Sequence, residues 1–303
     1  MGAGHGHGAA TGQGSAAHRW RLKVSFGLVF LFFFVELVVG IWSNSLALIS
    51  DAGHMAADVT TLGAALVATR IASRPDSTGM RTFGSYRAEI FASGFAVLVM
   101  LGVSVYIVVE AIGRIGQPVE LATGPVLLVG TLGLVVNLIA IALLRSGSKD
   151  SLNVKGAYLE VIADTVGSVG VIASGLLVMW TGNAFWDTVI ALAIGLFVAV
   201  RAVMLGREVL AVLGQHAPSG AKPDDVADVL GKVSGVTSVH DLHVWTLTSG
   251  MNVATAHLAI APGTDHAKVL DEAQAVMRKE FGVEHATFQV ENEERKNCQE
   301  ISW

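Results

Sequence analysis

Three side chains able to ligate a metal ion fall within eight positions of a mostly apolar stretch. Asp51, His54 and Asp58 follow the spacing i, i+3 and i+7, which places them on one face of an α-helix. A charged side chain at the centre of a bilayer costs at least ~2.5–3.5 kcal/mol on insertion scales. We therefore expect this face to contact a partner helix, water or an ion rather than lipid.

A second apolar stretch carries a matching set. Glu160 and Asp164 are four residues apart, and Ser168 lies one helical turn further along the same face. Together the two stretches offer one imidazole and three carboxylates, a donor set that can close a tetrahedral shell around zinc. Imidazole also suits cobalt and nickel, whereas an all-oxygen set would suit magnesium, calcium or manganese. A structural polar cluster or a metal-free proton relay is the alternative, but two such pairs in separate membrane stretches favour metal.

Metal binding at these residues would be coupled to protons, because the ligands must be deprotonated to bind. Alternating exposure of the site to the two sides of a membrane would then exchange metal for protons. Asp51 lies one turn from His54, and we interpret Asp51 and Ser168 as residues of the ion or proton pathway. Glu36 and Asn137 also lie within apolar runs, and we interpret them as groups that form hydrogen bonds between helices.

The composition places these stretches in a membrane protein. Hydrophobic residues make up 52% of the 303 residues and charged residues 15%, whereas about a quarter of a soluble domain is charged. The mean hydropathy is +0.57. Six apolar segments are each long enough to cross a bilayer as a helix, which takes about 20 residues. They cover residues 22–42, 46–71, 90–112, 125–144, 152–180 and 185–204, and the candidate ligands fall in the second and fifth.

The basic residues predict the orientation of these segments. Ten of them flank the segments on the side of the N-terminus, and only Arg114 lies in the opposite loops. Because cytoplasmic loops carry an excess of Lys and Arg, we expect both termini in the cytoplasm and a multi-pass protein of a bacterial-type inner membrane. Arg201 and Arg207, at the end of the sixth segment, agree with this orientation. The ten residues are Arg19, Arg21, Lys23, Arg70, Arg74, Arg81, Arg87, Arg145, Lys149 and Lys155.

From about Gln215 the chain has the composition of a small soluble domain. The patterns predict a helix at 222–233, strands at 236–247 and 253–260, a helix at 265–281 and a strand at 286–291. This αββαβ order indicates an α+β fold with a sheet and a helical layer. The predicted parts are a disordered N-terminal tail (1–18), a six-helix transmembrane domain (19–210), a cytoplasmic domain (211–293) and a C-terminal tail (294–303).

Several classes of function are disfavoured. A formal net charge of −5, without a large basic surface, argues against a nucleic-acid partner. The single cysteine, Cys298, excludes an intrachain disulfide framework and a cysteine-cluster metal site. No HExxH or similar hydrolytic motif is present, which argues against an intramembrane metalloenzyme. The expected partners are therefore divalent metal ions and the lipid bilayer.

Four segments resemble the cation diffusion facilitator family in their order and spacing. They read FFFVELVVGIWSNSLALISDAGHMAADV (32–59), FGSYRAEI (83–90), NVKGAYLEVIADTVGSVGVI (153–172) and VHDLHVW (239–245). The resemblance implies a homodimer of six-helix subunits, each with a ferredoxin-like cytoplasmic domain, that exports divalent metal in exchange for protons. Carried over by motif, it implies a transport site made of His54, Asp58, Glu160 and Asp164.

One position departs from the zinc-selective members of that family, which usually carry His where this chain has Glu160. Replacing nitrogen by oxygen makes the site harder, so we expect zinc with looser rejection of cobalt, cadmium or nickel. The resemblance also implies a regulatory zinc ion in the cytoplasmic domain. The residues implied for it are His240, His257, His266 and Glu291. Gln289 stands where some relatives carry another His, and strand alternation predicts His240 and His243 on opposite faces.

The leading hypothesis is therefore a secondary transporter rather than an enzyme. It is a cation/proton antiporter that moves Zn²⁺, with Co²⁺, Cd²⁺ or Ni²⁺ as further substrates, out of the cytoplasm. Two alternatives stay open. One is an exporter of Mn²⁺ or Fe²⁺ with the same fold, which the imidazole of His54 disfavours. The other is a membrane metal sensor that binds without transport.

Overall fold

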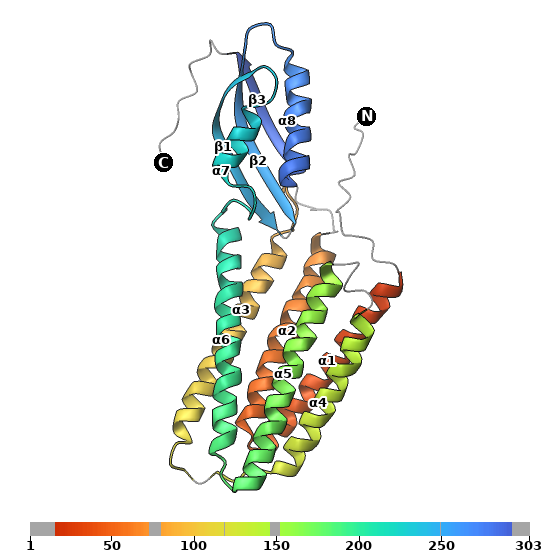
Figure 1. The fold of residues 1–303 in the computed structure, drawn as a ribbon, viewed down its shortest axis with the longest axis vertical. Helices are drawn as coiled ribbons and strands as arrows, with labels where there is room; N and C mark the ends of the chain where they lie inside the picture. The colour runs from red at the N-terminus through yellow and green to blue at the C-terminus, as the bar shows by residue number, and fades with distance from the viewer. Residues whose placement is uncertain (1–15, 73–79, 118, 146–151, 249, 293–303) are drawn as a thin grey trace. The chain divides into compact units, whose positions relative to one another are not determined.

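The structure is a computed structural model that describes residues 16–72, 80–117, 119–145, 152–248 and 250–292 (Figure 1). The first six helices are α1 (Ala16–Ser43), α2 (Leu46–Ala72), α3 (Ala88–Gly113), α4 (Thr123–Leu144), α5 (Leu152–Thr181) and α6 (Phe185–Leu213). They form at the six apolar segments, although α6 continues well beyond the predicted end at 204. The tail predicted at 1–18 lies outside the described residues except for 16–18, which begin α1. The tail predicted at 294–303, with Cys298, lies wholly outside them.

The helical part has the character of a membrane domain. Within the described residues, four helices are long and apolar enough to cross a bilayer, at 88–113, 123–144, 158–181 and 185–213. The described apolar part of α1, Gly27–Ser43, is shorter. Large apolar side chains such as Leu98, Leu128 and Leu196 are exposed on these helices. Helices suit this setting because a helix satisfies its own backbone hydrogen bonds where lipid offers no partners.

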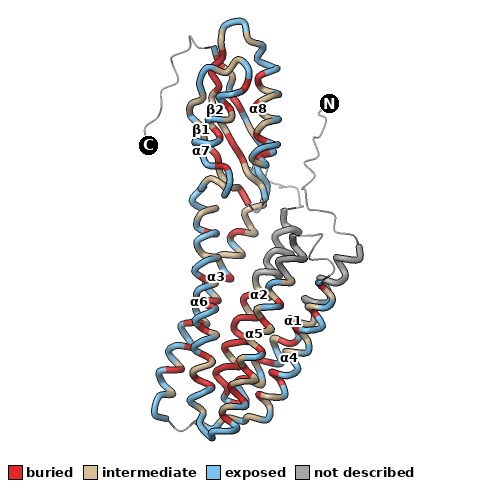
Figure 2. Tube along the Cα trace, in the orientation of Figure 1, coloured by how far each residue is buried: buried red, intermediate tan, exposed pale blue. Residues whose placement is uncertain are grey.

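Packing brings α1, α2, α4 and α5 together. Helix α4 contacts both α1 and α5, and one apolar cluster contains Phe32, Leu48, Val126 and Val171, one from each of the four helices. Buried residues are densest along the first half of α2 (Figure 2). The first half of α2 is almost completely enclosed, since nearly every residue from Leu46 to Met55 is buried. Polar side chains on this half of α2 therefore face protein.

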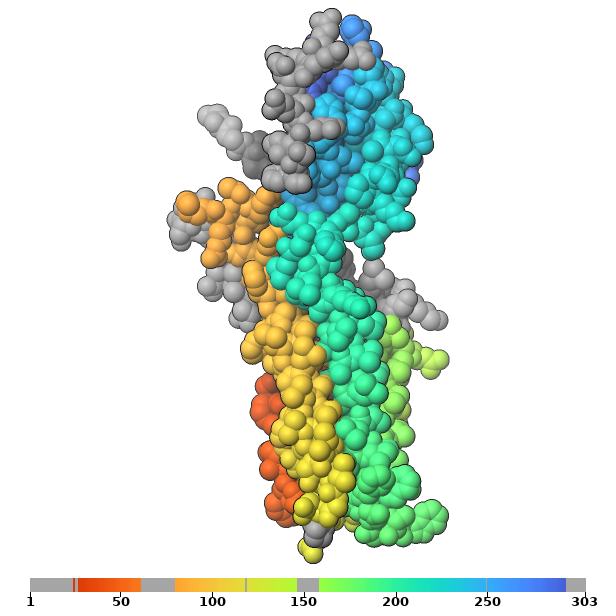
Figure 3. All heavy atoms as spheres, turned by 90° about the vertical axis from the view of Figure 1, so that its left-hand side faces the viewer, coloured from red at the N-terminus to blue at the C-terminus, as the bar shows by residue number. Residues whose placement is uncertain are grey.

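Helices α3 and α6 run beside each other on one side of the helical part (Figure 3). Ser104 Oγ on α3 donates a hydrogen bond to the Gly195 carbonyl oxygen on α6 at 3.3 Å. A Cβ atom added to Gly195 would lie 3.2 Å from the Ile107 side chain, so the two backbones approach closely there. The contact joins α3 and α6 at the level of Gly195. Arg201 follows six residues later, about 9 Å along the helix.

The second part of the chain is a three-stranded sheet with two helices. Its elements are α7 (Pro223–Leu230), β1 (Val236–Thr248), β2 (Met251–Ile260), α8 (His266–Phe281) and β3 (His285–Asn292), in the predicted αββαβ order. The sheet order is β1-β2-β3, with β1 antiparallel and β3 parallel to β2. Helix α8 is the crossover that a parallel pair requires. Its first turn is capped by Asp265, whose carboxylate accepts a hydrogen bond from the Ala267 N–H at 2.9 Å.

The core of this sheet domain lies on one face of the sheet. Leu230 of α7, Leu258 of β2 and Met277 of α8 are fully buried in a single apolar cluster. Successive side chains of a strand point to opposite faces. The neighbours of Leu258 on β2, including His257, therefore project from the face without helices.

Candidate metal centres

The start of α2 is held by a buried carboxylate from α6. Ser45 Oγ accepts a hydrogen bond from the Leu48 N–H at 3.2 Å, as an N-cap residue does. The Asp187 carboxylate accepts hydrogen bonds from Ser45 Oγ at 2.7 Å, the Leu46 N–H at 2.6 Å and the Ala47 N–H at 3.3 Å. A negative charge at a helix N-terminus is stabilised by the helix dipole. This anchor determines where the polar face of α2 lies.

Three of the four predicted transport-site residues converge. His54 Nε2 lies 3.3 Å from Asp164 Oδ1 and 3.7 Å from Asp58 Oδ2. One ligand atom from each residue lies within 4.8 Å of the others, and all three residues are buried. Zinc–nitrogen and zinc–oxygen bonds are about 2.1 Å long, so two ligands of one tetrahedral ion are about 3.4 Å apart. The two separations from His54 Nε2 are therefore close to those between ligands of one tetrahedral ion.

The carboxylates of this cluster have unused acceptor positions. Asp58 Oδ2 and Asp164 Oδ1 are buried and have no hydrogen-bond partner among the described residues. A buried carboxylate oxygen without a donor or cation is costly. These two oxygens point to a positively charged ligand between α2 and α5.

Glu160, the fourth predicted residue, is engaged by an arginine on α6. The Arg201 guanidinium donates a hydrogen bond to Glu160 Oε1, and its Nη1 lies 3.2 Å from His54 Nε2. A guanidinium only donates hydrogen bonds, so Nε2 is the acceptor in this contact. Glu160 also faces Asp58. The four predicted residues are therefore neighbours, but Arg201 competes for two of them.

Sequence reasoning missed this role of Arg201. Its place at the end of the apolar segment 185–204 predicts only a basic residue that agrees with the cytoplasmic orientation. In the structure α6 continues to Leu213, so Arg201 is an interior residue of the helix. Two signals pointed to it: a basic residue within an apolar run, and an unusual acid, Glu160, on another helix. A charged side chain within a membrane needs a partner, so a basic residue and an acid on two membrane helices are candidates to pair with each other.

The structure tests the interpretation of the other polar residues. Asn137 Nδ2 donates a hydrogen bond to Ser168 Oγ at 3.2 Å, so the predicted hydrogen bond between helices is confirmed for Asn137. The same interpretation is wrong for Glu36. Both of its carboxylate oxygens are buried without a hydrogen-bond partner among the described residues. Asp51 is buried against Gly167 of α5, and a Cβ atom added there would lie 2.2 Å from Asp51 Oδ1.

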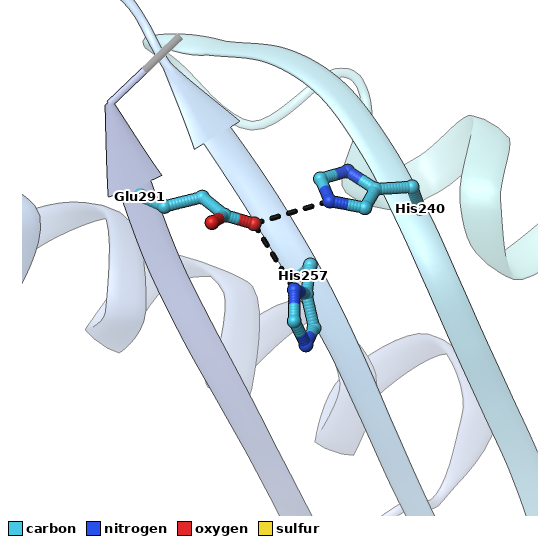
Figure 4. A group of neighbouring side chains, drawn as sticks. All are labelled: His240, His257 and Glu291. Carbon is cyan, nitrogen blue, oxygen red and sulfur yellow. Dashed lines mark hydrogen bonds and ion pairs between the residues drawn. The ribbon is translucent and has the colours of Figure 1, made fainter. Parts of the chain in front are cut away.

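A second cluster lies on the helix-free face of the cytoplasmic sheet (Figure 4). Glu291 Oε1 lies 3.1 Å from His240 Nε2 and 3.0 Å from His257 Nδ1. The two imidazoles come from directly paired positions of β1 and β2, with ring centroids 5.2 Å apart. Two nitrogens and one carboxylate oxygen form a set that zinc accepts. Among the described residues this group does not include His266, which is exposed in the first turn of α8.

A β-bulge makes one prediction about this face wrong. His240 pairs with His257 and His243 pairs with Thr255, so three steps on β1 match two steps on β2. The extra residue falls at Asp241, whose φ angle is +49°, and it breaks the alternation. His240 and His243 consequently share one face. The Asp241 carboxylate contacts His243 and one member of the cluster. It lies 3.0 Å from His243 Nε2 and 3.7 Å from His257 Nε2.

Comparison with known proteins shows what the chain is similar to. A family model described as the cation efflux transmembrane domain matches residues 22–213, and one described as the cation efflux protein cytoplasmic domain matches residues 218–293. The metal cation efflux system protein CzcD of Cupriavidus metallidurans is 41% identical over 96% of this chain and 90% of its own length. The zinc transporter ZitB of Escherichia coli is 34% identical over 89% of this chain and 87% of its own length. The cadmium, cobalt and zinc/H(+)-K(+) antiporter of Bacillus subtilis is 32% identical over 90% of this chain and 88% of its own length.

Proposed function

The chain belongs to the cation efflux family of membrane transporters, and from this premise we propose that it exports Zn²⁺ from the cytoplasm in exchange for protons. Co²⁺, Cd²⁺ and Ni²⁺ are proposed as further substrates. Zinc stands in the names of two relatives, and cadmium and cobalt stand in the name of one of them. The donor set supports the same choice, because one imidazole and several carboxylates suit zinc and its neighbours better than magnesium or calcium.

One observation carries the proposal: His54, Asp58 and Asp164 converge from two helices inside the membrane domain. In the proposed cycle the ion binds His54 Nε2 and the two carboxylates, and Glu160 is the fourth ligand. The ligands must lose their protons to bind, so metal and protons occupy the site in turn. Alternating exposure of the site to the two sides then couples metal export to proton import.

Arg201 takes part in this cycle as the partner of the unloaded site. Neutral His54 has one lone pair on Nε2, and Arg201 contacts that nitrogen at 3.2 Å. The ion needs the same lone pair, so the guanidinium must withdraw when the ion binds. The three carboxylates and Arg201 sum to a charge of −2, which a divalent ion balances. Arg201 therefore offsets the extra negative charge that Glu160 brings.

The arrangement of the chain in the membrane belongs to the same proposal. We infer that α1 to α6 all span the membrane, that the boundaries lie near 19–210 and 211–293, and that both termini are cytoplasmic. The family matches at 22–213 and 218–293 support the boundaries, and the excess of basic residues on the side of the N-terminus supports the orientation. We further propose a ferredoxin-like cytoplasmic domain, a homodimer and a bacterial inner membrane location.

We also propose that the cytoplasmic cluster binds a regulatory zinc ion. Its members are His240, His257 and Glu291. The short distances from one Glu291 oxygen to two imidazoles support this role. The exposed His266 is kept as an outer ligand of the same site in the proposal, although its side chain does not join the group in this structure.

The test of transport is metal uptake into inverted membrane vesicles. Asp58→Ala and Asp164→Ala should abolish zinc uptake while the protein is still inserted at normal levels, because each removes a charged ligand from the cluster. Glu110→Gln is the matched control, since Glu110 is a membrane-domain acid that pairs with Arg114 away from the cluster. Unchanged uptake in both alanine variants would refute the assignment. Competition between zinc and cobalt in wild type and Glu160→His tests the selectivity, which should change if Glu160 is a ligand.

A further inference from the structure

An aromatic ring on α6 contacts two residues of the proposed transport site. Phe197 lies four residues before Arg201, so the two side chains share one face of α6. The Phe197 ring lies 5.9 Å from the His54 imidazole, measured between centroids, and the two planes are inclined by 77°. The Arg201 Cζ atom lies 6.0 Å from the centre of the same phenyl ring. Phe197 therefore contacts a proposed ligand and the side chain that competes for it.

His54 lacks the partner that usually orients a ligating imidazole. A histidine that binds a metal through one ring nitrogen almost always donates a hydrogen bond from the other to a carboxylate, a carbonyl or water. His54 Nε2 faces the carboxylates of Asp58 and Asp164. Its Nδ1 is buried and has no hydrogen-bond partner among the described residues. The contact with Phe197 can orient the imidazole instead, because an edge-to-face aromatic pair stabilises about as much as a hydrogen bond does.

Arg201 depends on the phenyl ring in another way. The guanidinium contacts His54 Nε2 at 3.2 Å and donates a hydrogen bond to Glu160 Oε1. The proposed ion uses both of these residues as ligands, so it competes for both contacts. It does not compete for the face of the Phe197 ring. At 6.0 Å the guanidinium is at the outer limit of a cation–π contact, so this contact can strengthen when Arg201 leaves Nε2.

We propose that Phe197 is a positioning residue of the transport site, which orients His54 and receives the Arg201 guanidinium when a divalent ion enters. This inference rests on the proposed transport of divalent metal. In the unloaded site Arg201 contacts His54 Nε2. In the loaded site the ion takes Nε2 and the guanidinium lies over the phenyl face. Removing the ring should then weaken zinc binding, because the displaced guanidinium loses this place and the imidazole is less well oriented.

The test is zinc binding at equilibrium by the full-length protein in detergent, with a fluorescent chelator as competitor. Phe197→Leu removes the aromatic face and should raise the Kd roughly 10-fold, whereas Phe197→Tyr keeps that face and should bind as wild type does. Phe95→Leu is the matched control, because Phe95 is an exposed phenylalanine of α3 outside the contacts with His54 and Arg201. A wild-type Kd in Phe197→Leu would overturn the inference, and so would equal losses in Phe197→Leu and Phe197→Tyr. If Asp164→Ala binds zinc as wild type does, the proposed transport site itself fails.

A double-mutant cycle separates positioning from general packing. In an Arg201→Met background there is no guanidinium to receive, so Phe197→Leu should raise the Kd by less, roughly 3-fold. A packing role that is independent of Arg201 predicts the same fold change in both backgrounds, and that result would overturn the inference. Phe197→Met, which carries a flexible apolar side chain without an aromatic face, replaces Phe197→Leu in both backgrounds if the leucine variant does not fold.

Discussion

Glu160 and Arg201 should offset each other's charge at the metal cluster, and replacing them separately and together tests this reasoning. Arg201 donates a hydrogen bond to Glu160 and contacts His54 Nε2 at 3.2 Å. Arg201→Met removes a positive charge beside the ion, so it should strengthen zinc binding. Glu160→Gln leaves Arg201 without its carboxylate, so it should weaken zinc binding. The double variant restores the charge balance but lacks the Glu160 ligand, so it should bind zinc more tightly than Glu160→Gln and more weakly than Arg201→Met.

The size of these effects follows from the charges and their exposure. Two unit charges about 4 Å apart interact by about 4 kcal/mol at an effective dielectric constant of 20. The Arg201 and Glu160 side chains are 28% and 32% exposed, so water screens part of this energy. We expect about 1.4–2.8 kcal/mol for each single variant, which corresponds to roughly 10- to 100-fold in Kd. The shifts should have opposite signs.

The assay is zinc binding at equilibrium by the purified full-length protein in detergent, in competition with a fluorescent chelator at fixed pH and salt. Glu110→Gln is the control, because Glu110 forms the same kind of pair with Arg114, at 3.2 Å, elsewhere in the membrane domain. Its Kd should equal that of wild type. Weaker binding in Arg201→Met than in wild type would refute the reasoning. That result would mean that Arg201 holds the ligands in position rather than offsetting their charge.

Two further predictions concern other carboxylates. Asp187→Ala removes the acceptor of hydrogen bonds at the start of α2, so it should destabilise the detergent-solubilised protein by about 2–4 kcal/mol. Asp187→Asn keeps one acceptor and should lose less stability. Equal melting curves for the two variants would contradict the capping role. Glu291→Gln should reduce the heat of zinc binding that calorimetry measures for the full-length protein in an Asp164→Asn background, because it removes the charge between His240 and His257. An unchanged heat of binding would refute the proposed regulatory site.

Hydropathy and helical spacing were sufficient to predict most of the helical domain. Apolar runs of about 20 residues have few alternatives in lipid, and helices form at all six of them. The spacing of His54 and Asp58 predicts that both face one neighbour. Two such pairs on two helices then predict a single cluster, and His54, Asp58 and Asp164 do converge. Local periodicity determines these features, so the sequence alone reveals them.

Features that depend on contacts between distant elements were harder to predict. The β-bulge at Asp241 adds one residue to β1, and nothing in the alternation of that strand indicates it. Glu36 has no hydrogen-bond partner among the described residues, and this depends on what α4 places opposite it, which at Gly133 is a backbone without a side chain. A pattern on one helix shows that a polar group is buried. It does not show whether the facing helix satisfies that group.

Arg201 changes how the unusual Glu160 is understood. Counted along the sequence, the site holds three carboxylates and a neutral imidazole, an excess of charge that should bind protons and many metals with little discrimination. In the structure the guanidinium of α6 offsets one of those carboxylates and reaches His54 as well. The net charge is then that of two carboxylates, as it would be if position 160 carried a neutral histidine. Selectivity should therefore depend on Glu160 and Arg201 as a pair, and a histidine introduced at position 160 should recover strict zinc preference only when Arg201 is also neutralised.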